Sequence, residues 1–311
     1  MTPQTAHIPV LLEETIRLLD PKPGEIAVDC TTGLGGHSSA LAKAVGPAGQ
    51  VLGFDLDAGN LAPTAQRIEE AGGRFTPVHA NFVLAADELE KRKLRADLLL
   101  ADLGFSSNQM DDPQRGLSFA FDGPLDMRLD PGAMITASDL VASLSERELA
   151  DIIYQYGEDP LARKIARKLV QIRQQEPIRS TARLARLVQE AYGQKARSSR
   201  MHPATRTFMA LRIAVNDELG ALRGLLDSIV QGAEQVERGG WLNRGARVAV
   251  ISFHSLEDRL VKQCFANLVQ RGLATRLTKK PVGPSETEVR HNPRSRSAKL
   301  RAVRIGAPTK P

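Results

Sequence analysis

Four aspartates at the ends of apolar runs are the first residues in the chain whose spacing could do chemistry. Asp29, Asp55 and Asp102 each end a short apolar run, and Asp57 lies two residues past Asp55. Such runs predict buried strands. Because the carboxyl ends of parallel strands meet at one edge of a sheet, the four acids are expected to gather there. Carboxylates at that edge can accept hydrogen bonds from ribose hydroxyls and attract a cationic ligand.

A glycine-rich turn, Gly33–Gly36, separates the first apolar run from an alanine-rich helical stretch, as in a nucleotide-binding βαβ unit. The strict dinucleotide pattern fails, because Ser38 stands where its third glycine should be. Lys and Arg are absent from the four segments that carry strand ends, namely 26–42, 51–66, 78–90 and 96–114. A diphosphate would find no countercharge there, whereas a sulfonium, an ammonium and a ribose would find acids. We therefore expect S-adenosylmethionine (SAM) rather than NAD.

Hydrophobic periodicity predicts the elements that position these residues, in an α/β Rossmann-like fold with a mostly parallel sheet. Parallel strands are expected at 26–28, 51–54, 74–78, 96–101 and 245–253, and an antiparallel pair at 273–278 and 300–305. Helices are expected between them, including a short one within 9–20 and one after His254.

The alternation of helix and strand stops after Gln109, which predicts an insertion into the sheet domain. Residues 110–133 are too apolar for a disordered linker and predict an ordered loop that folds over the site. Helices are expected at 146–156, 161–174 and 181–192, followed by one long amphipathic helix over 205–236. The predicted boundaries are 1–112 and 213–311 for the sheet domain and 113–212 for the inserted, helical, substrate-recognition domain.

The net charge of +6 conceals two strongly basic segments. Residues 160–212 carry a net +11 and residues 271–311 a net +9, which leaves −14 on the rest of the chain. Basic segments beside an acidic body predict a polyanionic partner, specifically RNA. The N-terminus has no signal-peptide pattern, no apolar run reaches membrane-spanning length, and only Cys30 and Cys264 are present. A cytoplasmic protein without a membrane partner is the expectation.

An acidic cofactor pocket beside an RNA-binding surface predicts methyl transfer, a direct displacement that needs no metal. If the acceptor is the exocyclic amine of a base, its lone pair is delocalised into the ring. Hydrogen bonds from the amine to the Asp102 carboxylate and the Leu103 carbonyl would return electron density to nitrogen. The base would also have to leave its stack to reach the pocket.

Five stretches resemble, in order, the RsmH (MraW) family of bacterial 16S ribosomal RNA cytosine-4-amino methyltransferases. They are VDCTTGLGGHS, ADLGFSSNQMDDPQRGLSFAFDGPLDMRLD, HPATRTFMALRIAVNDEL, VISFHSLEDR and NPRSRSAKLRAVRI. The resemblance implies a class I methyltransferase fold with a helical insert, and methylation of a cytidine in the decoding region of the small ribosomal subunit. It implies cofactor contacts from Gly35, Gly36, His37, Asp55, Phe82, Asp102 and Gln109, the last from the resemblance alone.

Several assignments stay open at the level of sequence. The segment Asp102–Phe105 lacks the two prolines of the motif that amino-methyltransferases of DNA carry there, so Asp102 is either catalytic or only cofactor-binding. Phe82 fits an adenine contact or a core position, and His254 a substrate contact or a turn. Asp126 fits a structural role or a substrate role.

The polar run after the fifth strand and the overall function also have alternatives. Asp258, with its neighbours, fits an internal polar network slightly better than direct catalysis. A nicotinamide-dependent oxidoreductase and a non-catalytic RNA-binding assembly factor are the alternative function classes.

Overall fold

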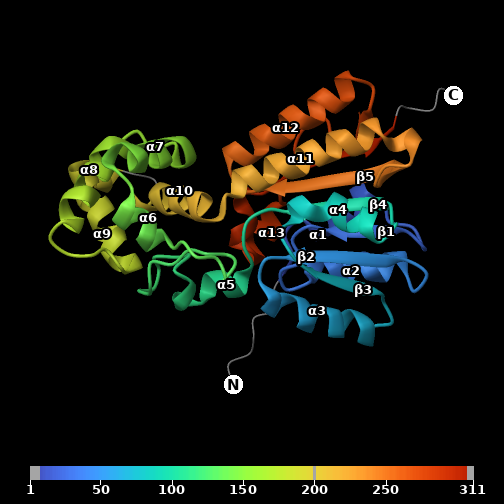
Figure 1. Cartoon of the computed structure of the whole chain (residues 1–311), viewed down its shortest axis with the longest axis horizontal. Helices are drawn as coiled ribbons and strands as arrows, with labels where there is room; N and C mark the ends of the chain where they lie inside the picture. Colours follow the sequence, from blue (N-terminus) through green and yellow to red (C-terminus); the bar gives the residue numbers. More distant parts are fainter. Residues whose placement is uncertain (1–7, 199–200, 307–311) are drawn as a thin grey trace. The chain divides into compact units, whose positions relative to one another are not determined.

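The computed structural model describes residues 8–198 and 201–306, and the chain divides into two compact units (Figure 1). The sheet unit comprises the residues up to Gly104 together with those from Leu219 onward, and the helical unit comprises Phe105–Glu218. The two boundaries differ by eight and six residues from those expected at 112/113 and 212/213. The role of the helical unit in substrate recognition stays a prediction.

The sheet unit is built on a seven-stranded sheet in the order β3-β2-β1-β4-β5-β7-β6. Its strands are β1 Ile26–Asp29, β2 Gln50–Asp55, β3 Phe75–His79, β4 Ala96–Asp102, β5 Leu242–Ser252, β6 Ala274–Arg276 and β7 Lys299–Ile305. β1 to β5 are parallel, and β7 runs antiparallel to both β5 and β6. The predicted Rossmann-like fold, with five parallel strands and an appended antiparallel pair, is confirmed.

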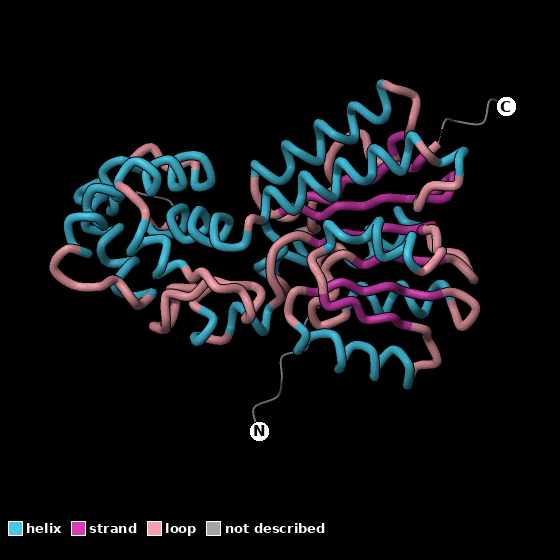
Figure 2. Tube along the Cα trace, viewed as in Figure 1, coloured by secondary structure: helices cyan, strands magenta, loops and turns pink. Residues whose placement is uncertain are grey.

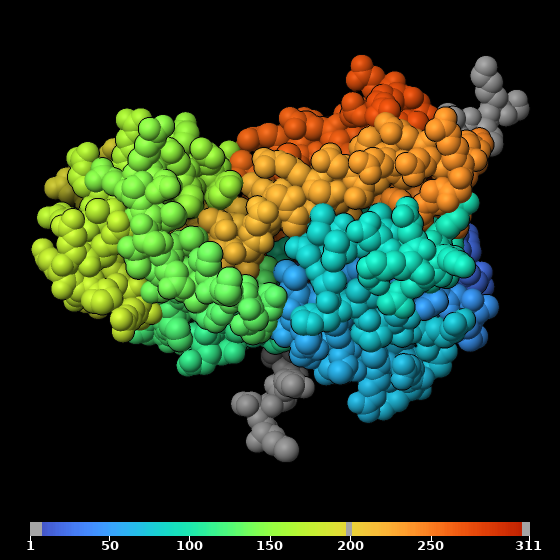
Figure 3. All heavy atoms as spheres, viewed as in Figure 1, coloured from blue at the N-terminus to red at the C-terminus, as the bar shows by residue number. Residues whose placement is uncertain are grey.

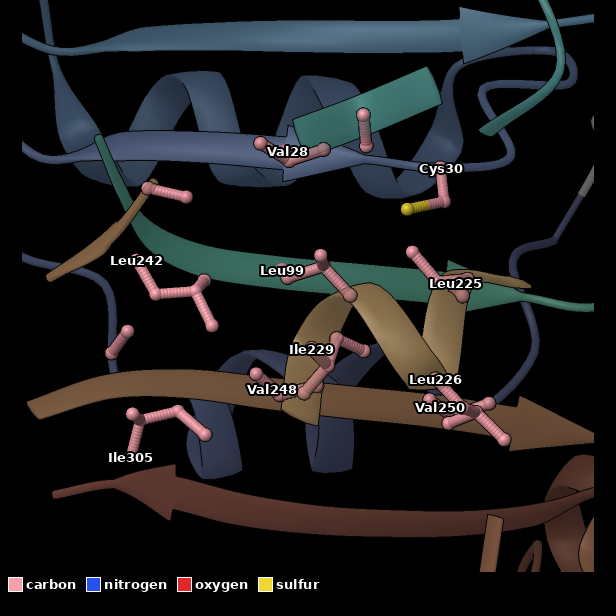
Figure 4. Close-up of a cluster of buried hydrophobic side chains, with 14 of the residues drawn as sticks. Val28, Cys30, Leu99, Leu225, Leu226, Ile229, Leu242, Val248, Val250 and Ile305 are labelled. Carbon is pink, nitrogen blue, oxygen red and sulfur yellow. The ribbon is translucent and has the colours of Figure 1, made fainter. Parts of the chain in front are cut away.

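Helices cover both faces of this sheet because its strands are apolar on both sides. α1 Leu12–Leu19, α2 Gly36–Val45 and α3 Ala58–Glu70 pack on one face, and α4 Ala85–Lys91, α11 Glu218–Glu234 and α12 Ser255–Gln270 on the other. Figure 4 shows Leu225, Leu226 and Ile229 of α11 packed among side chains of β4 and β5. α11 and α12 run side by side (Figure 3), and the Cys264 thiol lies 3.8 Å from the Leu226 carbonyl oxygen.

The helical unit consists of short helices joined by loops (Figure 2). Its helices are α5 Ser107–Asp111, α6 Ala137–Ser143, α7 Glu146–Gly157, α8 Ala162–Arg173, α9 Thr181–Tyr192 and α10 Ala204–Asn216. The loop between α5 and α6 is ordered, as predicted. Within it, Arg128 donates to both carboxylate oxygens of Asp126, at 2.8 and 2.7 Å. The ion pair therefore braces the loop internally, and the folding of this loop over a site stays a prediction.

The long helix predicted over 205–236 is wrong, because the chain breaks it into α10 and α11. Asp217 between them is left-handed, with φ 46°, which an uninterrupted helix cannot contain. The Asn216 amide fixes the break, since it donates to the Met127 carbonyl and accepts from the Leu129 N–H at 2.8 and 2.7 Å. The apolar stripe continues across the break, so its periodicity gave no sign of it.

Candidate functional site

The carboxyl edge of the sheet brings the predicted acids of β1, β2 and β4 together. Thr31, just past β1, links two of these strand ends, because its hydroxyl accepts from the Asp102 N–H at 2.7 Å. Asp29 is fully buried, and it accepts from the Ser38 hydroxyl at 2.6 Å and the Thr31 N–H at 3.1 Å. Burial raises the pKa of Asp29 to about 6, although these hydrogen bonds oppose the rise.

Asp55 anchors the glycine turn to the end of β2. Its carboxylate accepts from the Gly33 N–H at 2.7 Å, the Asp57 N–H at 2.8 Å and the Asn60 amide at 3.2 Å. Burial raises the pKa of Asp55 despite these bonds. A carboxylate offers about four acceptor positions, so roughly one remains for a ribose hydroxyl.

The turn itself requires glycine. Gly35 is left-handed at φ 75°, and a Cβ there would lie 2.6 Å from the Thr64 hydroxyl oxygen. Gly36 begins α2, and a Cβ on it would collide with the Pro9 ring. The Arg67 side chain donates to the Leu34 carbonyl. Arg67 lies one residue beyond the segment 51–66, which contains no Lys or Arg. The sequence argument missed this cation, which packs against the turn and is engaged with its backbone.

His37 lies in the first turn of α2 and contacts both the N-terminal segment and β4. Its Nε2 is 3.1 Å from the Val10 carbonyl oxygen, and its Nδ1 is 3.5 Å from Oδ2 of Asp102. The ring is only 6% exposed. Since a carbonyl accepts only, Nε2 carries the proton that it donates to Val10, and the contact of Nδ1 with Asp102 is favourable when a proton lies between the two groups.

Asp102 is the most perturbed acid of the edge. Burial, and then the nearby charges of Asp29 and Glu257, raise its pKa well above the usual range. Its Oδ1 is buried and has no hydrogen-bond partner among the residues that the structure describes. A buried acceptor without a partner is costly, so this oxygen is suited to an N–H donor or a cation from a ligand. The residues present thus fit a cationic cofactor with amino groups, such as SAM.

The other residues expected to contact the cofactor have structural contacts of their own. Phe82 is half-buried and packs against the core under α4 and α11, so it has a core contact whether or not adenine also meets it. Gln109 is buried in the helical unit, where its side-chain oxygen accepts from the Ser106 N–H at 3.0 Å and caps α5. Leu103 is buried, and its N–H donates to the Ile251 carbonyl.

The polar residues after β5 form local pairs. His254 caps α12, and its Nε2 lies 3.1 Å from Oε1 of Glu257. Glu257 also accepts from the Phe253 N–H at 2.8 Å. Asp258 accepts from Arg301 of β7 at 2.7 and 3.2 Å, so a main partner of this acid comes from a distant strand. This arrangement favours the network interpretation for Asp258 and a turn role for His254.

Comparison with known proteins gives a family for this architecture. The model of the MraW methylase family matches residues 4–305. A ribosomal RNA small subunit methyltransferase H of Cyanothece sp. is 46% identical over 308 residues, covering 99% of this chain and 97% of the relative. One from Symbiobacterium thermophilum is 44% identical over 314 residues, covering 96% of each chain. A solved rRNA methylase of Streptococcus thermophilus is 11% identical with a TM-score of 0.41, covering 94% of this chain and 95% of its own.

Proposed function

The chain belongs to the MraW methylase family, and on that premise we propose that it methylates the exocyclic 4-amino group of a cytidine in 16S ribosomal RNA, with SAM as methyl donor. Beyond family membership, the observation that carries the proposal is the buried Oδ1 of Asp102 at the end of β4, which has no hydrogen-bond partner within residues 8–198 and 201–306. Relatives that share nearly the whole length carry the name of a small-subunit rRNA methyltransferase.

The proposed cofactor contacts of the sheet unit come from Gly35, Gly36, His37, Asp55, Phe82 and Asp102, and Gln109 of the helical unit is proposed from the family resemblance alone. When bound, SAM supplies a methyl group on a cationic sulfur. Gly35 and Gly36 let the turn pack tightly against Thr64 and Pro9, and Asp55 offers its remaining acceptor position to a ribose hydroxyl. His37 lies next to Asp102 on the side of α2, with Nδ1 3.5 Å from Oδ2.

Two roles are proposed for Asp102. As a catalytic residue, it would accept one N–H of the cytidine amine through Oδ1, while the Leu103 carbonyl accepts the other, so that the nitrogen keeps its electron density. As a cofactor-binding residue, it would balance the positive charge of SAM. The first role is supported because Asp102 and Leu103 are adjacent in sequence, so both acceptors lie at the end of β4. The second role is supported because the nearby acids Asp29 and Glu257 add negative charge that attracts a cation.

We propose the small ribosomal subunit as the partner and the cytoplasm as the compartment, because that is where the proposed RNA lies. No helix in the described ranges is long and apolar enough to cross a membrane. The basic helices of the helical unit are partly neutralised, since Lys168 pairs with Glu190 at 3.0 Å and Arg167 with Glu146 at 3.4 Å. Arg163 and Lys164 of α8 are exposed and form no ion pair with a carboxylate among the described residues, so both keep their charge for phosphate.

The test is transfer of labelled methyl from SAM to small-subunit rRNA, followed by digestion to nucleosides and identification of the modified base. We expect label on the 4-amino nitrogen of one cytidine. Calorimetry with SAM, S-adenosylhomocysteine and NAD addresses the oxidoreductase alternative, for which only NAD would bind. Tight SAM binding without methyl transfer to naked RNA, precursor particles or assembled subunits would support the assembly-factor alternative and overturn the proposal.

A further inference from the structure

A hollow of about 90 Å³ lies on the sheet unit between α12 and the antiparallel pair β6 and β7. Lys262 and Phe265 of α12 form one side, and Arg276, Thr278 and Lys279 at the end of β6 form the other. Phe265 is buried and closes the floor. The volume suffices for several waters or for a small anion.

The walls of this hollow carry unneutralised positive charge. Lys262, Arg276 and Lys279 are exposed, and none of the three forms an ion pair with a carboxylate in the described part of the chain. Arg301 also lines the hollow, but its charge is balanced by Asp258 at 2.7 Å. These three cations line one concave surface with no carboxylate paired to them in the described residues. They therefore repel one another, and an anion bound between them would relieve that repulsion.

The fold fixes this arrangement. The Thr278 hydroxyl accepts from the Ala302 N–H at 3.2 Å, which holds the segment after β6 against β7 and leaves the hydroxyl proton free to donate to a ligand. Lys262 stands three residues before Phe265 on α12, so the buried ring anchors the face of the helix that presents the ammonium group.

The hollow belongs to the same unit as the candidate active site. Asp102 of β4 is paired in register with Ile251 of β5, which is paired with Leu300 of β7, next to Arg301. Arg276 of β6 is paired with Val303, three residues further along β7 and one strand beyond it. Since neighbouring strands are about 4.8 Å apart and residues rise about 3.3 Å along a strand, the cations of the hollow lie roughly 15 to 20 Å from the end of β4. An RNA strand whose base reaches Asp102 can therefore place a phosphate a few nucleotides away in it.

We propose that this hollow, defined by Lys262, Arg276, Thr278 and Lys279, is a phosphate-binding site for the backbone of the substrate RNA. The proposal rests on the proposed function for the identity of the polyanion. On this proposal, residues of α12 and of the segment at the end of β6 bind the RNA directly on the sheet unit. RNA is favoured over an acidic protein or a membrane because the site is concave and small and lies on the same sheet as the candidate active site.

The test compares the natural protein with the triple variant K262Q/R276Q/K279Q, using fluorescently labelled small-subunit rRNA fragments as the probe at several salt concentrations. Loss of three phosphate contacts should reduce the slope of log K against log salt by about 2 to 3 and weaken binding roughly 10- to 100-fold near physiological salt. The affinity for SAM, measured by calorimetry, should not change. That measurement also shows that the variant is folded.

The matched control is K43Q/R74Q/K93Q, which removes three exposed cations of the same unit that do not line the hollow. An equal loss of RNA affinity in the control would show that only the net charge of the protein matters, which would overturn the proposal. Unchanged RNA affinity in the triple variant, with methyl transfer intact, would overturn it and leave the proposed function standing. Weaker binding to anionic phosphatidylglycerol vesicles, with RNA binding unchanged, would assign the site to a membrane instead. Failure of methyl transfer in the natural protein would reject the proposed function independently.

Discussion

The imidazole of His37 lies between the Val10 carbonyl and the Asp102 carboxylate, with Nδ1 3.5 Å from Oδ2 of Asp102. One ring therefore connects the N-terminal segment to the end of β4. Because Oδ2 faces His37, Oδ1 is left as the buried acceptor that lacks a partner among the described residues.

Replacing Asp102 with Asn separates the two roles proposed for this residue. If Oδ1 accepts the amine N–H in the transition state, Asp102→Asn should slow single-turnover methyl transfer at saturating SAM by about 100-fold. Rapid-quench kinetics with labelled SAM measure this rate. Weaker SAM binding with an unchanged chemical rate would leave only the cofactor role.

Gly35→Ala should destabilise the protein by about 2 to 5 kcal/mol. A left-handed alanine costs about 1 to 2 kcal/mol, and overlap with Thr64 adds about 1 to 3 kcal/mol. Urea denaturation measures both this variant and the control Gly239→Ala. Gly239 has a similar conformation, φ 87° and ψ 26°, but open space around its Cβ position. Equal losses in the two variants would show that close packing at the turn contributes nothing.

Because Asp29 is buried, the free energy of unfolding should decrease as the pH rises. Its pKa rises from 3.8 to about 6 on folding, so the folded state binds the proton more tightly than the unfolded state. The free energy of unfolding therefore decreases as pH rises through this window. Relative to the natural protein, Asp29→Asn should gain about 2 kcal/mol between pH 4.5 and pH 7. Denaturation of both proteins without SAM at the two pH values checks this, and a constant difference would contradict it.

Glu288 of α13, Glu286–His291, holds the N-terminal segment from a distant part of the sheet unit. Its Oε1 accepts from the Leu11 N–H at 2.8 Å, next to the Val10 carbonyl that contacts His37. Glu288→Ala should weaken SAM binding roughly 5- to 10-fold through loss of this hydrogen bond, and Glu288→Gln, which keeps an acceptor, should restore most of it. Calorimetry measures the affinities.

The control for the hydrogen bond between Glu288 and Leu11 is Glu286→Ala on the same helix. Glu286 is 92% exposed and lies 3.7 Å from Arg290, so its removal should leave SAM affinity unchanged. If Glu288→Ala binds SAM as tightly as this control does, α13 has no part in positioning His37.

Arg247 on β5 is the buried cation on which the packing of α1 depends. Its guanidinium donates to both oxygens of Glu25, at 2.9 and 2.6 Å, and to the carbonyls of Leu19 and Asp20. Arg247→Met should cost about 3 to 5 kcal/mol, because Glu25 loses its partner. Thermal and urea denaturation compare this loss of stability with that of the control Arg244→Ala. Arg244 forms an exposed ion pair with Glu237, so its replacement should cost under about 1 kcal/mol. Similar losses for the two would contradict the burial argument.

The strands, their direction and the edge at which the acids meet could all be predicted from the sequence. Apolar runs that end in Asp29, Asp55 and Asp102 carry this information locally, and parallel connections leave one way to assemble them. The motifs also determined the family, since they extend over nearly the whole chain.

The contacts of the polar side chains could not be predicted from the sequence and became known from the folded structure. Asp258 pairs with Arg301, 43 residues away, and Asn216 breaks a continuous apolar stripe by binding a distant loop. In the part of the chain that the structure describes, Oδ1 of Asp102 has no partner, because His37 and the Thr31 hydroxyl contact other atoms of the same residue. Hydrogen bonds and ion pairs form between residues that folding makes neighbours, and periodicity along the chain does not encode those distances.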